Sequence, residues 1–274
     1  LLPDGTEIPG TNFDYNYLQH RKVDVVSSAL DFILPFEKYK ITAGAKVSFT
    51  NTRNGINYDT SDPTLVQDDY FRYKEQIYAL YADYSREFSE RFSMQLGLRM
   101  EHTRTTGISE AKDTEDKHDY TRLFPTVYLL YSPTDGHALN SSFSNRISRP
   151  SQNMVNPFPF YQNKYTYACG REDLKPSYTY NAELGYTLKN NFNVSAYYSY
   201  SDDVFFQVVD LDAETNVTSF LWENFMQTHA FGLNNSYTFR TKWLQAYAQH
   251  GVSYRRTTSS AATTSPEEKG WAYN

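Results

Sequence analysis

Apolar and polar residues alternate with a period of two along most of this chain. The pattern is clearest at residues 92–101, where Phe92, Met94, Leu96, Leu98 and Met100 alternate with Ser93, Gln95, Gly97, Arg99 and Glu101. An α-helix would spread these residues around its axis, whereas successive side chains of a β-strand point to opposite faces. The apolar face of such a strand must lie against a packed core, a second sheet or lipid.

Nearly every other segment alternates in the same way, so the sequence predicts an all-β fold. About ten antiparallel strands are expected to follow one another in an up-and-down meander: residues 12–34, 39–49, 70–88, 91–103, 121–132, 139–147, 178–189, 192–201, 227–239 and 243–255. Because proline has no N–H for a β-ladder, we expect a bulge or local irregularity at Pro125. The final residues, GWAYN, lie inside a further predicted strand.

The composition favours lipid as the partner of the apolar faces. Hydrophobic residues make up 39% of the chain, whereas roughly 45–50% is usual for globular domains when glycine is also counted. The chain contains 25 tyrosines and 18 phenylalanines. A transmembrane β-barrel has such a composition because its lumen is polar, its outer face is apolar, and aromatic residues mark both membrane interfaces. With 26 basic and 32 acidic residues the net charge is −6, which argues against nucleic-acid binding.

The predicted connections alternate between short and long. Short turns are expected at 35–38, 86–90, 132–136, 189–191 and 240–242, and long loops at 51–69, 104–118, 148–176, 202–221 and from 256 onward. Residues 205–209 are expected to extend the wall above the membrane. Outer-membrane barrels have short periplasmic turns and long extracellular loops. The sequence therefore predicts a single, partial β-barrel domain over residues 1–274, in contact with lipid in the outer membrane of a Gram-negative bacterium.

Several segments resemble a known family. SFSNRISRPSQNMVNPF (142–158) and GREDLKPSYTYNAELGYT (170–187) resemble TonB-dependent outer-membrane receptors of the outer-membrane-protein β-barrel type, as do residues 71–85, 97–103 and 123–132. The resemblance implies a non-enzymatic receptor without a cofactor. Such a receptor binds an extracellular small molecule, peptide or glycan and imports it with energy from the TonB system. Barrels of this kind have about 22 strands, so this chain corresponds to about half of one, and we expect it to contain no plug domain.

The residues alone leave two other classes of function open, an outer-membrane barrel enzyme and a soluble glycan-binding β module. The sequence contains no GxSxG, P-loop or GxGxxG motif, and its six histidines form no HxH or HExxH pair, so neither a catalytic nor a metal site is predicted. The acidic run at 110–119 is at most a weak calcium candidate. Cys169, the single cysteine, is interpreted as an unreactive loop thiol.

The candidate ligand-binding residues are charged or aromatic and belong to the predicted lumen or outer loops: Arg99, Glu101, Arg146, Arg149, Phe158, Phe160, Tyr161 and Glu183. Arg146 and Arg149 could form a basic mouth for an anionic or glycan ligand. Alternatively, they could pair with wall carboxylates such as Glu183 or brace the loop against the plug, which we expect this chain to lack. The aromatic run 157–167 could stack on sugar rings or bury itself as an Ω-loop. The predicted lumen carboxylates are interpreted as structural rather than as acid–base catalysts.

The ends of the predicted sheet present a further question. Ten strands of a larger barrel have two open edges, and each unpaired backbone group costs several kcal/mol in lipid. The first and last strands could pair into a small ten-stranded barrel, but bulky lumen residues such as Tyr81, Trp243 and Tyr247 would then crowd together. We therefore expect an incomplete sheet, or one completed by another copy, rather than a closed small barrel.

Overall fold

The computed structural model describes residues 15–60, 68–260 and 267–274, so the expectations for residues 12–14, 61–67 and 261–266 lie outside the described part. The strands are β1 (Tyr15–Pro35), β2 (Tyr39–Thr60), β3 (Asp69–Ser89), β4 (Phe92–Ser109), β5 (Thr114–Tyr131), β6 (His137–Ser148), β7 (Phe160–Asn163), β8 (Thr166–Cys169), β9 (Ser177–Leu188), β10 (Phe192–Asp212), β11 (Val217–Arg240), β12 (Gln245–Ser259) and β13 (Glu267–Tyr273). One four-residue helix, α1 (Gln152–Val155), precedes β7. No helix among the described residues has the length and apolar character needed to span a membrane.

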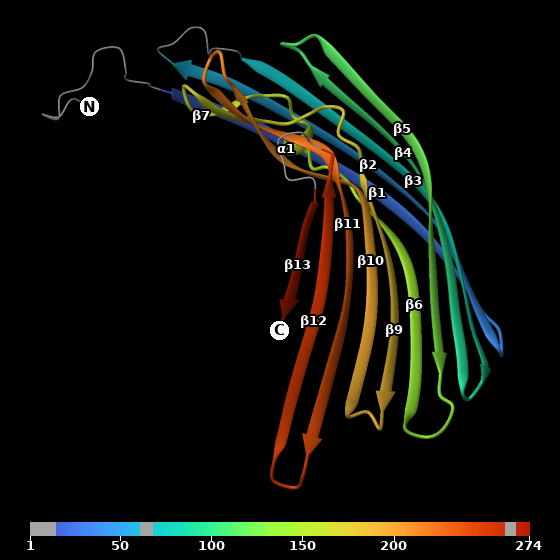
Figure 1. Ribbon diagram of the computed structural model, residues 1–274. Helices are drawn as coiled ribbons and strands as arrows, with labels where there is room; N and C mark the ends of the chain where they lie inside the picture. Colours follow the sequence, from blue (N-terminus) through green and yellow to red (C-terminus); the bar gives the residue numbers. More distant parts are fainter. Residues whose placement is uncertain (1–14, 61–67, 261–266) are drawn as a thin grey trace, which may run out of the picture.

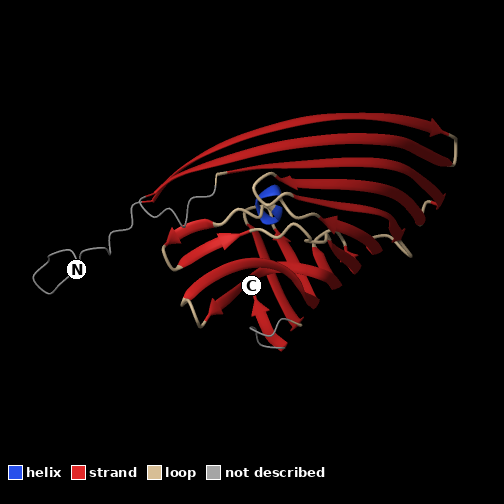
Figure 2. Ribbon diagram, turned by 90° about the horizontal axis from the view of Figure 1, so that it is seen from above, coloured by secondary structure: helices blue, strands red, loops and turns tan. Residues whose placement is uncertain are grey.

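The predicted antiparallel meander is confirmed. The strands pair in the order β1-β2-β3-β4-β5-β6-β9-β10-β11-β12-β13, and the two short strands β7 and β8 lie off this path. Residues 270–273 belong to β13, as the ending GWAYN predicts. The sheet curves strongly, with α1 on its concave side (Figures 1 and 2). Among the described residues β1 does not pair with β12 or β13, so the expected incomplete sheet is confirmed.

Several strands are longer than the sequence predicts. β2 has 22 residues and β11 has 24, whereas strands were predicted at 39–49 and 227–239. β1 and β3 have 21 residues each, close to their predicted lengths, whereas about 9–11 suffice to cross the hydrocarbon of a bilayer. The loops predicted at 104–118 and 202–221 are wrong, because the ladders of β4 with β5 and of β10 with β11 run through them. The expected extension of the wall by residues 205–209 is confirmed.

The register places apolar and polar residues on opposite faces of the sheet. One row, on the convex face, runs through ten ladders and is almost entirely apolar: Leu34, Ile41, Tyr84, Leu96, Val127, Phe143, Ala182, Tyr198, Phe231, Tyr254 and Trp271. The adjacent row, on the concave face, includes Thr42, Asp83, Gly97, Thr126, Ser144, Asn181 and Ser199. Leu34 is 51% exposed and Trp271 58%, so the convex face is an uncovered apolar surface.

The wall splits where β5 leaves β6. Their ladder runs only from Tyr131 paired with Leu139 to Thr126 paired with Ser144, and beyond it the two strands separate (Figure 1). The ladder with β4 passes through Pro125 without a register shift, so the bulge predicted there is wrong on that side. Because proline cannot donate to a ladder, the irregularity lies on the other side, where pairing with β6 ends one residue away.

Residues 149–176, here called the excursion, fill the concave side at this split and include α1, β7 and β8. β8 adds to the sheet in parallel with Thr218–Leu221 of β11. On the other side of the split, the Thr114 hydroxyl of β5 donates to the Glu172 carboxylate over 3.2 Å. The excursion therefore joins β5 and β11, which are not paired with each other.

Candidate functional site

The excursion is anchored to the inner wall by one arginine. Arg149 follows β6 directly, and its Nη2 donates to Glu101 Oε2 over 2.5 Å and to Thr103 Oγ1 over 3.1 Å. Its Nε lies 3.8 Å from Glu75 Oε2. The side chains of Glu75 and Glu101 are only 19% and 10% exposed, and Arg149 lies within ion-pair distance of both.

The same carboxylate binds a second arginine. Arg99 Nε donates to Glu101 Oε1 over 2.6 Å, and the two residues are neighbours on the concave face of β4. Glu101 thus accepts one arginine on each oxygen. Arg99 and Glu101 are brought together by strand alternation, whereas Arg149 comes from 48 positions further along the chain.

Arg146 behaves differently from Arg149. It is exposed, and it has no ion pair or hydrogen bond with the described residues. It lines a cavity of about 480 Å³ on the concave face together with Arg99, Glu101 and Phe124. The structure therefore brings three of the predicted residues, Arg99, Glu101 and Arg146, to one cavity, with a free guanidinium among them.

Tyr81 also lines this cavity, although the sequence predicts it only as a bulky residue of the lumen. Its hydroxyl donates to Asp31 Oδ1 over 2.5 Å, and the Arg99 guanidinium lies 5.3 Å from its ring centroid. Its ring lies over Gly44, where an added Cβ would come within 2.6 Å of the ring. The period-two pattern places Tyr81 in the lumen, but only the register shows that a glycine on β2 leaves room for its ring.

The aromatic segment of the excursion divides into buried and accessible parts. Phe158 is 1% exposed and lies edge-on to Phe71, with ring centroids 6.1 Å apart. Together with Ile56, Val155 and Leu174 these two residues form a buried cluster against the wall. Phe160 and Tyr161 in β7 stay partly accessible, and Phe160 lies edge-on to Tyr17. Phe158 is therefore closed to a ligand, whereas Phe160 and Tyr161 are partly accessible.

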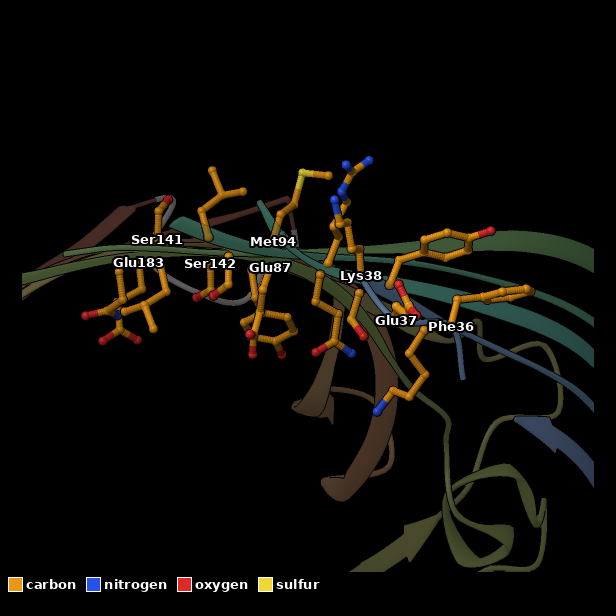
Figure 3. A pocket seen from close by; sticks show the side chains of 18 residues that line it. Phe36, Glu37, Lys38, Glu87, Met94, Ser141, Ser142 and Glu183 are labelled. Carbon is orange, nitrogen blue, oxygen red and sulfur yellow. The ribbon is translucent and has the colours of Figure 1, made fainter. Parts of the chain in front are cut away.

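Glu183 lies apart from the other candidates. It belongs to a concave-face row with Lys40, Ser85, Gln95, Tyr128 and Ser142, near the short turns. This row lines a groove of about 750 Å³, and Figure 3 shows Glu183 and Ser142 on the face opposite to Met94. One interpretation of the sequence paired the arginines with wall carboxylates such as Glu183. Arg149 does pair with wall carboxylates, but these are Glu75 and Glu101 and not Glu183. Ser177 of β9 pairs with Ser148, the residue before the excursion, and Glu183 lies six residues further along β9. Glu183 is therefore about 20 Å from the start of the excursion.

The remaining chemistry-bearing residues form no reactive centre in the described part of the chain. Cys169 is half-buried in β8, and burial raises the pKa of its thiol, which disfavours the nucleophilic thiolate. The acidic run 110–119 is divided among local ion pairs, such as Glu115 with Lys117 and Asp119 with Arg104. The described residues include no group of three or more histidine, cysteine or carboxylate side chains placed to hold a metal ion.

A match to a protein family identifies the class of protein to which this sheet belongs. The Outer membrane protein beta-barrel family matches residues 2–274. The chain belongs to this family. No curated protein matches the chain. Family membership confirms the outer-membrane location, and it excludes the soluble glycan-binding module.

Solved structures similar to this family member show the same fold. The copper transporter OprC aligns with a TM-score of 0.63 at 12% identity, over 89% of this chain and 39% of OprC. The hemophore receptor HasR from Serratia marcescens, in complex with its hemophore HasA and heme, gives 0.58 at 11%, over 91% and 43%. The ferric yersiniabactin uptake receptor FyuA from Yersinia pestis gives 0.52 at 14%, over 96% and 37%. The chain thus spans about two fifths of these proteins, and the family match confirms the resemblance of residues 142–187 to the outer-membrane-protein β-barrel type.

Proposed function

We propose that the chain forms part of the wall of an import receptor and is not an enzyme. Its convex face would contact membrane lipid, and its concave face would line the path of an extracellular ligand. The observation that carries the proposal is the two-faced sheet. Its convex row is apolar across ten ladders, while the adjacent concave row is polar. A wall of this kind separates lipid from an aqueous lumen.

The long strands support an extracellular role for the upper wall. Because roughly ten residues cross the hydrocarbon, about half of each 21-residue strand projects beyond it. The end with the excursion and long strands would face outward, and the end with short turns would face the periplasm. The cavity with Arg99, Arg146 and Tyr81 then lies on the concave wall below the excursion, where its free guanidinium suits an anionic or hydroxyl-rich ligand.

Energy coupling is the second part of the proposal. A receptor of this type would release its ligand inward with energy delivered by TonB through a plug. The polar groove near the short turns, which includes Glu183, offers hydrogen-bonding groups for such a plug. The ligand class proposed is an extracellular small molecule, peptide or glycan. The names of the solved structures describe uptake of metal, siderophore and heme ligands by those proteins, which supports an import role without fixing the ligand here.

The test is uptake by whole cells. Cells with and without the gene are incubated with a defined mixture of iron–siderophore complexes, short peptides and oligosaccharides, and depletion of each component is followed by mass spectrometry. We expect at least one component to be taken up only by cells with the gene. Its uptake should stop when a protonophore removes the proton gradient, and it should fall in Arg146→Ala but not in Arg240→Ala, an exposed control. Gene-dependent uptake that survives the protonophore would contradict energy coupling, and equal depletion by both strains would contradict import.

A further inference from the structure

A second cavity, of about 350 Å³, lies against the unpaired upper edge of β5. Residues Lys117 to Tyr120 all line it, and because neighbouring strand residues point to opposite faces, the cavity includes the edge of β5. Tyr73, Glu75 and Thr105 of the concave wall line it as well. Its opposite side is formed by the end of the excursion, by Tyr178 and by Asp203. The cavity therefore occupies the split in the wall, and its volume is at the lower end of the range for small-molecule sites.

Four cations line this edge cavity, and two of them are already neutralised. Lys117 Nζ lies 2.8 Å from Glu115 Oε2, and Arg149 is held by Glu101. Arg122 and Lys175 have no carboxylate within ion-pair distance among the described residues. They lie on opposite sides of the split, Arg122 on β5 and Lys175 at the end of the excursion.

Arg122 and Lys175 are both held in position by contacts that do not neutralise their charge. The Arg122 guanidinium lies 4.7 Å from the ring centroid of Tyr178, which is itself buried. The backbone of Lys175 bonds the Asn224 side chain twice, through its N–H over 2.8 Å and through its C=O over 2.9 Å. Positioned cations with unused N–H donors are the groups that bind carboxylate or phosphate oxygens.

The acidic side chains of the cavity point to a ligand that also carries hydroxyl groups. Asp119 is paired with Arg104, and Glu172 accepts the Thr114 hydroxyl. The Asp203 carboxylate has no ion pair among the described residues, and it lines the cavity with Arg122 and Lys175. A carboxylate accepts hydrogen bonds from hydroxyl groups, whereas it repels a second anion. An oxyanion flanked by hydroxyl groups therefore satisfies all three residues.

We propose that the edge cavity binds an anionic sugar, with its phosphate or carboxylate between Arg122 and Lys175 and its hydroxyl groups on Asp203. The site shares no lining residue with the cavity at Arg146 that is assigned to the import path. The sugar can be a soluble sugar phosphate or the phosphorylated headgroup of an outer-leaflet glycolipid, since both present the same chemistry.

Calorimetric titration of the purified full-length protein with glucose 1-phosphate tests the proposal. We expect saturable binding that weakens with added salt, no binding of neutral glucose, and a loss of about tenfold or more in affinity for each of Arg122→Gln and Lys175→Gln. Lys175 is exposed, so its substitution leaves the fold intact. Lys117→Gln removes the same charge from a lining residue that is already paired, and it should change affinity less than about twofold.

A second arm identifies the source of the sugar. Vesicles containing diphosphorylated lipid A are compared with neutral phosphatidylcholine vesicles as competitors for glucose 1-phosphate. Competition by the lipid A vesicles alone supports the proposal with a headgroup as ligand, and no competition supports it with a soluble ligand. The proposal is overturned if glucose 1-phosphate does not bind, if glucose binds equally well, or if Lys175→Gln binds like the unmodified protein.

Discussion

Replacing Arg149 with alanine is expected to lower the free energy of unfolding by about 3–5 kcal/mol. The substitution leaves Glu75 on the inner wall without an ion pair among the described residues, and it leaves Glu101 with Arg99 alone, although both carboxylates have little access to water. Removing one partner of a buried charge pair costs much more than the pair itself contributes. Denaturant unfolding followed by the fluorescence of Trp222, which packs on the cluster beneath the excursion, measures the change.

Arg171→Ala is the matched control for this substitution. Arg171 also joins the excursion to the wall, through Glu223 of β11, and it pairs with Asp173 within the excursion, but its side chain is 47% exposed. Exposed ion pairs contribute at most about 1 kcal/mol, so the control should change stability little. Equal effects of the two substitutions would contradict the role assigned to Arg149. Adding Glu75→Gln and Glu101→Gln to Arg149→Ala should recover part of the loss.

Replacing Phe158 with alanine is expected to cost about 3–5 kcal/mol as well. Its ring is buried against Phe71 and fills the centre of the cluster that joins the excursion to β2 and β3. The cavity left behind removes both the buried apolar surface and the ring contact. We expect the excursion to detach before the sheet unfolds, which limited proteolysis within residues 149–176 detects as faster cleavage.

Phe206→Ala provides the comparison for Phe158→Ala. Phe206 lies on the upper wall and is 58% exposed, so its truncation should cost well under half as much. If Phe158→Ala leaves both the unfolding free energy and the cleavage rate of the excursion unchanged, the excursion is not held by the buried cluster. Faster cleavage in both variants would point to a general loosening of the upper wall.

The alternation of residues predicts the lower part of this sheet well. Residues 92–101 form β4 in the predicted phase, because one face is apolar and the other faces the lumen. The alternation fades in the upper parts of β4 and β5, where both faces are polar. Thr105 and His118 are ladder partners there, although both belong to a segment predicted as a loop. Backbone pairing with long neighbouring strands maintains these segments as strands, and no local pattern reports it.

The candidate site was less predictable than the fold. Alternation alone places Arg99 and Glu101 side by side on the concave face. The partners of Arg149 depend on which strands lie beside the excursion. The sequence suggests wall carboxylates, with Glu183 on β9 as the example, and Glu75 and Glu101 on β3 and β4 are the ones that bind it. The edge cavity depends on where β5 and β6 separate. Pro125 was the only local signal for that point.

Spin-label accessibility along β4 tests the two-faced wall most directly. Single cysteines at Ser93, Met94, Gln95, Leu96, Leu98 and Arg99, in a Cys169→Ser background, are spin-labelled in the full-length protein reconstituted in lipid vesicles. We expect labels at Met94, Leu96 and Leu98 to collide mainly with oxygen, which concentrates in lipid. Labels at Ser93, Gln95 and Arg99 should collide mainly with a water-soluble nickel chelate. Equal accessibility at neighbouring positions, or the opposite phase, would contradict a wall between lipid and lumen.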